Sequence, residues 1–296
     1  MQLIKEIKVT NNYSGNGWNF EKTTKYILGF GEYQLEAGYF EHYNDDIFVK
    51  AVVEIPVSYG CPAHCKFCAT SAIDSFVPLE SYHMREIFEY IWTAQKLEKK
   101  QYVLLSVTGT GDLNYNFSNV VFFLSGLTLH GNLHVTLSSC MWNAQHLKEI
   151  ECLSEKIAIR NVQITHISVS EEKVTEVIPA YGQCSEKLDE ILAYIGISEK
   201  MYYRFNYIII DSLNDTEEDF YDFINKIESV KEKVVVRISK LNQTASTRRN
   251  NLYPAKIEKM KKFKSMLTDA GINSYLFYAY KNDQMNCGQL LTEKVL

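Results

Sequence analysis

The sequence is poor in the features that mark exported, membrane-bound and linker-rich proteins. It holds 5 prolines in 296 residues, too few for long extended linkers. Residues 1–8 interleave charged and apolar residues and lack the apolar core of a signal peptide. No stretch of the chain approaches the roughly 18 uncharged apolar residues that a membrane-spanning helix requires. We therefore expect a cytoplasmic protein without a membrane partner.

The chain also lacks an excess of basic over acidic residues. The chain has 31 Lys and Arg against 36 Asp and Glu, a net charge of −5. Proteins that wrap nucleic acid usually carry a positive excess, because phosphate neutralisation dominates their affinity. A large nucleic-acid footprint is therefore not expected. One basic stretch is the candidate RNA-facing patch, with an ordinary solvated helix face as the alternative; it comprises Arg248, Arg249, Lys256, Lys259, Lys261, Lys262 and Lys264.

The cysteines do not suggest a disulfide framework. There are 7 of them, an odd number at uneven spacing, at positions 61, 65, 68, 140, 152, 184 and 287. In a chain without an export signal, such a set indicates free thiols, metal ligands or catalytic groups.

The hydrophobic pattern, at 46% apolar residues, predicts an α/β fold. A β-hairpin is expected over 24–30 and 34–40, and a strand over 48–57. Beyond it, strand and helix patterns alternate, which indicates a parallel sheet with crossover helices. We predict a partial TIM-like barrel of six βα units with the active site at the carboxyl ends of its strands. The strands are expected at 102–107, 133–138, 160–169, 202–210, 233–239 and 274–279, and the helices near 81–98, 119–128, 143–155, 183–195, 216–230 and 254–270.

The domain organisation predicted from this pattern is simple. Residues 1–47 form an N-terminal β extension that contains the hairpin, and residues 48–296 form the barrel with a C-terminal segment that reaches the active site. The sequence shows no internal repeat and no low-complexity tract.

Three cysteines stand at CxxxCxxC spacing after the strand at 48–57. Cys61, Cys65 and Cys68 lie in a Gly-Cys-Pro loop, where their thiolates can converge on an iron–sulfur cluster. Three ligands leave one iron of a [4Fe–4S] cluster open to a substrate or cofactor. A zinc site is an alternative, but it needs a fourth ligand, for which His64 is the nearby residue. Buried structural cysteines are the other alternative.

The cysteine loop, with Phe67 before its last cysteine, resembles that of the radical S-adenosylmethionine (SAM) superfamily. The resemblance implies that Phe67 packs on the adenine of SAM and that the open iron binds the amino and carboxylate groups of SAM. Reduction then cleaves SAM to methionine and a 5′-deoxyadenosyl radical, which abstracts hydrogen from the substrate. A reductant such as flavodoxin or ferredoxin is an expected partner.

Further segments, collinear from about residue 24 to residue 290, resemble the 23S rRNA adenine methyltransferases of the RlmN/Cfr family. Residues 109–112, Gly-Thr-Gly-Asp, resemble the family's Gly-x-Gly-Glu-Pro segment. This implies that Gly111 and Asp112 hold the SAM amino group, although a GxG pair alone usually marks a turn. The family has a histidine where this chain has Ser170, and an ordinary strand-end hydroxyl is the alternative role for each serine. By resemblance, the further SAM-binding positions are Ser138, Ser168, Ser170 and Asn242.

The resemblance also supplies candidate catalytic residues. Residues 287–290, Cys-Gly-Gln-Leu, are similar to the family's methyl-carrying segment. Cys287 would accept a methyl group from one SAM, and the thiomethylene radical formed on it would add to an sp² carbon of adenine. The alternative is a small buried hydrophobic residue. Glu36 matches a glutamate that lies near the substrate in the family, and a solvated edge-strand carboxylate is its alternative.

The chain departs from the family at two points. The family releases its protein–substrate crosslink with a second cysteine, seven residues before the first cluster cysteine, where this chain has Glu54. A carboxylate cannot form the disulfide that releases the product. Cys140, at the end of a predicted strand, is the candidate substitute, and a spare buried thiol is the alternative. We also find no counterpart of the N-terminal accessory domain that helps larger members grip RNA.

Three functions follow from these observations. In the first, the protein methylates an RNA adenine and releases the crosslink in an altered way. In the second, it is a divergent radical SAM enzyme that modifies a small molecule, nucleotide or peptide in a biosynthetic pathway. The third, a non-enzymatic iron–sulfur sensor, is the weakest and would not need a SAM pocket.

Overall fold

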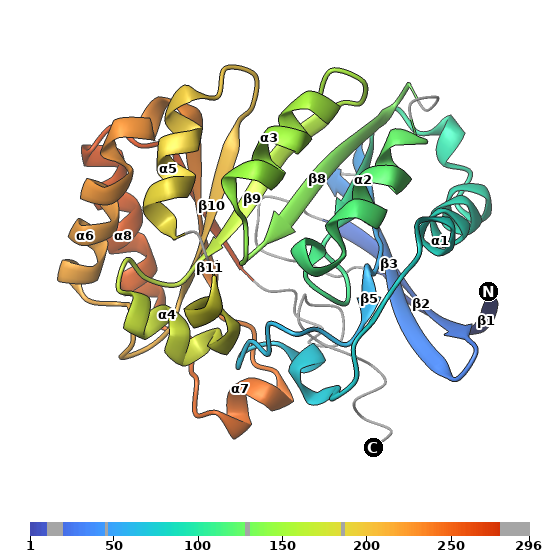
Figure 1. The fold of residues 1–296 in the computed structure, drawn as a ribbon, viewed down its shortest axis with the longest axis horizontal. Helices are drawn as coiled ribbons and strands as arrows, with labels where there is room; N and C mark the ends of the chain where they lie inside the picture. Colours follow the sequence, from blue (N-terminus) through green and yellow to red (C-terminus); the bar gives the residue numbers. More distant parts are fainter. Residues whose placement is uncertain (11–19, 45–46, 128–130, 185–186, 279–296) are drawn as a thin grey trace.

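The computed structural model describes residues 1–10, 20–44, 47–127, 131–184 and 187–278. Their strands form one ten-stranded sheet in the order β1-β2-β3-β4-β7-β8-β9-β10-β11-β12 (Figure 1). A separate two-stranded sheet pairs β5 with β6. The strands are β1 (Gln2–Thr10), β2 (Phe20–Phe30), β3 (Tyr33–Asn44), β4 (Ile47–Glu54), β5 (Ser58–Tyr59), β6 (Val77–Pro78), β7 (Val103–Val107), β8 (Leu133–Ser139), β9 (Ile159–His166), β10 (Tyr203–Ile209), β11 (Val234–Lys240) and β12 (Ser274–Phe277).

The N-terminal strands β1 to β4 are antiparallel. The predicted hairpin is present as β2 and β3, and Gly31 supplies the positive φ of +60° that its tight turn requires. Strand β1 was not foreseen and adds a third strand at the outer edge. Strand β3 pairs with β4, so the extension continues directly into the barrel sheet. The division of the chain at residues 47 and 48 stays a prediction.

In the large sheet, β4 and β7 to β12 are parallel and follow one another in sequence order. Six helices connect them, as the predicted six βα units require, and Figure 1 shows these helices covering the outside of the sheet. They are α1 (Ser81–Ala94), α2 (Phe117–Ser125), α3 (Ala144–Leu153), α5 (Leu188–Ile197), α6 (Glu217–Ile227) and α8 (Ile257–Asp269). None of the helices in the described ranges is long and apolar enough to cross a membrane.

Two short helices, α4 (Glu171–Val177) and α7 (Ala245–Arg249), were missed by the sequence analysis. Each is too short to show an apolar periodicity that stands out from its surroundings. The helix expected at 183–195 begins at Leu188, after the short 3₁₀ turn Pro179–Gln183. Both α4 and α7 lie at the carboxyl edge of the sheet in Figure 1, where the active site is expected.

The two faces of the sheet differ in chemistry. Alternate residues such as Val135 and Leu137 of β8 are buried in the main core with residues of the outer helices. Burying one such side chain stabilises the fold by about 1.5–3 kcal/mol. The residues between them face inward and pair across strands. Thr136 donates to Asn161 (2.8 Å), Gln163 to Ser138 (2.8 Å) and Ser239 to Asn206 (2.6 Å). The barrel thus presents a polar inner surface.

Candidate active site

The cysteine loop lies over the carboxyl ends of the central strands. Cys61, Cys65 and Cys68 belong to a hydrophobic cluster with the residues that directly follow β9, β10 and β11, which are Ile167, Ile210 and Leu241. The structure therefore brings the predicted cluster ligands to the predicted end of the barrel.

Gly60 sets the direction in which the loop leaves β5. Its φ is +69°, and a Cβ at this position would lie 1.9 Å from the carbonyl oxygen of Ser75. No other residue type fits such a turn without moving the backbone. The loop can therefore fold back beside β6 and still present its cysteines to the barrel.

Helix α7 and the two residues that flank it hold the loop from the other side. The hydroxyl of Thr244 donates to the carbonyl of Phe67 (3.1 Å), and that of Ser246 donates to the carbonyl of Lys66 (3.0 Å). Asn250 adds a second donor to Lys66 (3.1 Å). The sequence analysis missed these residues, because single hydroxyl and amide side chains carry no recognisable spacing. They fix the backbone on which Phe67 and the last cysteine stand.

The three thiols suit an iron–sulfur cluster. Burial, the Asp112 carboxylate and the neighbouring Cys65 and Cys68 together raise the pKa of the Cys61 thiol. In the part of the chain that the structure describes, no three His, Cys, Asp or Glu side chains are arranged to hold a metal ion. In a cluster, however, each thiolate binds a different iron, so the ligands need not converge on one point.

The glycine loop after β7 packs closely on the segment after β4. Gly111 has a φ of +93°, and a Cβ there would lie 1.9 Å from the hydroxyl oxygen of Ser58. A Cβ on Gly109 would lie 2.6 Å from the carbonyl oxygen of Ile55. The carbonyl of Thr110 accepts from the Val57 amide (2.9 Å). Both glycines are therefore required for this close approach.

The Asp112 carboxylate joins the glycine loop to the end of β8. It accepts hydrogen bonds from the Ser139 hydroxyl (2.6 Å), the Cys140 amide (2.9 Å) and the Asn114 amide (3.0 Å). With these contacts it is 9% exposed. Its position beside the cysteine loop fits the predicted SAM contact, which stays a prediction.

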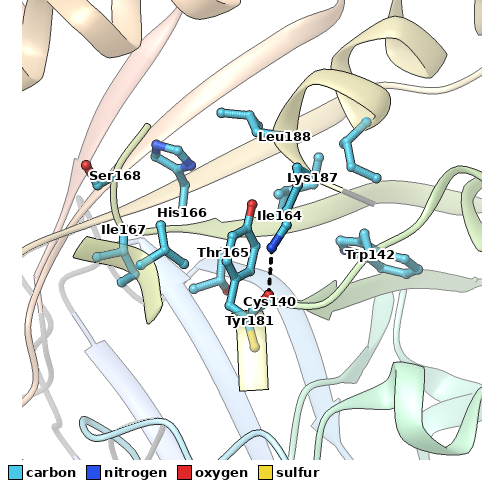
Figure 2. A pocket seen from close by; sticks show the side chains of 12 residues that line it. Cys140, Trp142, Ile164, Thr165, His166, Ile167, Ser168, Tyr181, Lys187 and Leu188 are labelled. Carbon is cyan, nitrogen blue, oxygen red and sulfur yellow. Dashed lines mark hydrogen bonds between the residues drawn. The ribbon is translucent and has the colours of Figure 1, made fainter. Parts of the chain in front are cut away.

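Cys140 lies beside the cysteine loop. Its sulfur is 3.8 Å from that of Cys65 and 3.2 Å from the Asp112 carboxylate. The contact with Cys65 and burial both raise the pKa of the Cys140 thiol. Figure 2 shows Cys140 at the border of a small cavity that Trp142, His166, Ser168 and Lys187 also line. Its predicted role in crosslink release stays untested.

The other predicted SAM residues lie at the same end of the barrel, in different settings. Ser138 is on the inner surface of β8, bonded to Gln163. Ser168 accepts from the Ser170 amide (3.1 Å), and Ser170 caps α4 by accepting from the Lys173 amide (3.4 Å). Asn242 follows β11 by two residues and is partly buried.

Glu36 lies on β3, an inner strand of the sheet, and is 4% exposed. The alternative of a solvated edge-strand carboxylate is therefore wrong. Its carboxylate pairs with the Lys25 ammonium of β2 (3.5 Å). Cys287 lies outside the described residues.

The basic stretch is partly neutralised by acidic neighbours. The Lys259 ammonium lies 2.6 Å from the Asp215 carboxylate, and Lys262 pairs with Glu217. These pairs reduce the positive charge available to a phosphate backbone, so the patch is weaker than its sequence suggests.

No family model matches the chain. It is 26% identical to a probable dual-specificity RNA methyltransferase RlmN of Dictyoglomus turgidum, over 98% of this chain and 79% of that protein. It is 27% identical to the protein of the same name from Dictyoglomus thermophilum, over 97% and 79% of the two chains.

Among solved structures, a radical SAM methyltransferase from Sphaerobacter thermophilus shares the fold. The TM-score is 0.74 at 16% sequence identity, over 98% of this chain and 81% of that chain. Similarity at this identity establishes a common architecture.

Proposed function

We propose that the chain is a radical SAM enzyme, like the RlmN methyltransferases that it resembles, and that it transfers a methyl group to an sp² carbon of a nucleobase with Cys287 as the methyl carrier. The observation that supports this most is the place of the cysteine loop. Its three cysteines pack on residues that follow β9, β10 and β11, above a polar inner surface.

Different residues of the chain would bind the cluster and SAM. Cys61, Cys65 and Cys68 would hold a [4Fe–4S] cluster, which with SAM supplies the radical when bound. The hydrogen bonds from Thr244 and Ser246 keep the loop in place. The residues that would contact SAM are Phe67, Gly111, Asp112, Ser138, Ser168, Ser170 and Asn242.

RNA is the first substrate to test, because the two Dictyoglomus relatives are named RNA methyltransferases. Two observations favour the second candidate, a small molecule or peptide. Glu54 replaces the thiol that releases the product in the family, and the basic stretch is partly paired with carboxylates. The electron donor we propose is a flavodoxin or ferredoxin.

The decisive experiment is anaerobic reconstitution with methyl-labelled SAM, a reductant and ribosomal RNA. We expect label on Cys287, formation of 5′-deoxyadenosine and label in the RNA. Cys61→Ala should lose the brown chromophore and all three products, whereas Cys152→Ala, an exposed cysteine on α3, should keep them. Wild-type protein that forms 5′-deoxyadenosine but never carries methyl on Cys287 would refute the carrier role. Label that enters a small-molecule or peptide fraction in place of RNA would favour the second candidate.

A further inference from the structure

A group of charged side chains spans β2, β3 and β4 on the inner surface of the sheet. In the strand register, Lys25 of β2 is opposite Gly38 of β3, and Gly38 is opposite Glu54 of β4. Side chains in one register row share a face, so Lys25 and Glu54 point the same way. Lys25 and Glu54 therefore lie on the same face, on either side of β3. Gly38 between them has no side chain, and the ring of Phe40 lies over it, 2.7 Å from the place that a Cβ would take.

The charges in this group do not balance. Lys25 and Glu36 are 5% and 4% exposed and form an ion pair at 3.5 Å. Glu54 is the second carboxylate, and within the described residues the charged groups that shift its pKa are one cation, Lys25, and one carboxylate, Glu36. On its other side, β7 and the residue that follows it supply hydroxyls. Thr108 donates to Glu54 Oε2 at 3.5 Å, and Ser106 and Thr108 bond each other at 2.7 Å.

These surroundings favour a proton on Glu54. Burial raises its pKa, and the Glu36 carboxylate raises it further, against the lowering effects of Lys25 and Thr108. A carboxyl whose pKa moves towards the working pH is suited to general acid–base chemistry. Unlike Lys25 and Glu36, Glu54 remains partly exposed. It is the last residue of β4, the strand that leads to the cysteine loop, so it stands at the active-site end of the barrel.

We propose that Glu54 is a catalytic residue that exchanges a proton with the bound substrate, while Lys25 and Glu36 hold its carboxyl in place from the neighbouring strands. This inference rests on the proposed function. In its ionised form, Glu54 accepts the proton of the substrate atom on a carboxylate oxygen, and the substrate atom keeps the electron pair of the broken bond. The substrate and Glu54 neither gain nor lose electrons overall in this step, so it needs no oxidant. Glu54 would thus carry out a proton transfer at the position where the relatives have a second thiol, and it does not replace the disulfide that releases their product.

The first test needs no substrate. Infrared spectroscopy of the protein at a series of pH values detects the C=O stretch of a protonated carboxyl. We expect one carboxyl that keeps its proton above the ordinary glutamate range of about 4.3. Its band should disappear in Glu54→Gln and persist in Glu32→Gln, which alters an exposed glutamate in the β2–β3 turn. In Lys25→Met the midpoint should move to higher pH, because the lowering effect of the cation is lost. If the band of protonated Glu54 is missing at every pH above the ordinary glutamate pKa of about 4.3, the inference is overturned.

The second test uses ribosomal RNA and methyl-labelled SAM. Label transferred per 5′-deoxyadenosine formed should fall about 100-fold or more in Glu54→Gln. Glu54→Asp should recover part of the transfer, and Lys25→Met should move the pH profile of transfer to higher pH. Full transfer by Glu54→Gln with an unchanged pH profile overturns the inference. A wild-type enzyme that cleaves SAM without labelling RNA contradicts the RNA substrate, and the infrared titration then decides the inference alone.

Discussion

The sulfur of Cys140 lies 3.8 Å from the sulfur of Cys65, although the two residues are 75 positions apart in the sequence. A disulfide bond is about 2.05 Å long, so small side-chain rotations would suffice to form one. We predict that cluster-free protein treated with diamide forms a Cys65–Cys140 disulfide. Peptide mass mapping should find this link and should find Cys152 unlinked to either residue.

The variant Cys140→Ser supplies the control for that prediction. It should leave Cys65 free after the same treatment and should assemble a cluster without prior reduction. Oxidised wild-type protein should need a reductant before assembly. If mapping recovers Cys65 and Cys140 as separate thiols, the two sulfurs do not meet in solution.

The hydroxyl of Ser246 should determine how firmly the cluster is retained. It donates to the carbonyl of Lys66 inside the cysteine loop. A hydrogen bond of this kind contributes about 1 kcal/mol, which corresponds to roughly a fivefold change in rate if it is lost on cluster release. Iron loss from Ser246→Ala to a ferrous chelator should therefore be about fivefold faster than from wild type. Ser125→Ala, which removes an exposed hydroxyl bonded within α2, should match wild type; equal rates in both variants would show that α7 does not hold the loop.

Substitution of Gly111 should destabilise the fold strongly. In Gly111→Ala, the new Cβ would meet the Ser58 hydroxyl and the residue would keep a positive φ. We expect a loss of at least about 2 kcal/mol in the free energy of unfolding, measured by urea denaturation of cluster-free protein. Gly131→Ala meets no atom within 4 Å and should change this free energy little. A stable Gly111→Ala protein would mean that the loop rearranges readily.

His166 should make the fold sensitive to acid. It is buried against Phe205, Tyr207 and Phe223, and burial lowers its pKa to about 3. In the unfolded chain, the His166 imidazole takes up a proton near its ordinary pKa of about 6.5, whereas in the folded protein it does so only near pH 3. The free energy of unfolding therefore falls as the pH drops from about 6.5 towards 3. Between pH 7 and pH 5, wild type should lose about 2 kcal/mol more stability than His166→Phe. If the free energy of unfolding falls equally with pH in wild type and His166→Phe, His166 is not the source of the acid sensitivity.

The sequence was sufficient to predict the barrel, because its buried strands and outer helices each repeat a recognisable apolar pattern. Val135 and Leu137, for example, alternate with inward polar residues and follow the period of a strand. The cysteine loop was also predictable, since three ligands at fixed spacing form a local motif. The contacts from Thr244 and Ser246 were not predictable, because they reach from α7 to residues about 180 positions away.

The charged group around Glu54 was hidden for a similar reason. Lys25, Gly38 and Glu54 become neighbours through strand register, and one residue of slip in β3 would separate them. The sequence showed that Glu54 stands where the family has a thiol, but not that a lysine would face it. The burial of Glu36 likewise depends on β1 and β4 flanking the hairpin, and β1 carries a weak alternating pattern.

The chemical difference between the two faces of the sheet bears on how this enzyme can diverge. Residues of the outer face carry the packing, so changes there are limited by the stability of the whole domain. Residues of the inner surface, such as Thr136 and Asn206, contribute hydrogen bonds of about 1 kcal/mol each and are replaceable in pairs. A lineage can therefore exchange inward residues and acquire a new substrate while the scaffold and its cysteine loop remain intact.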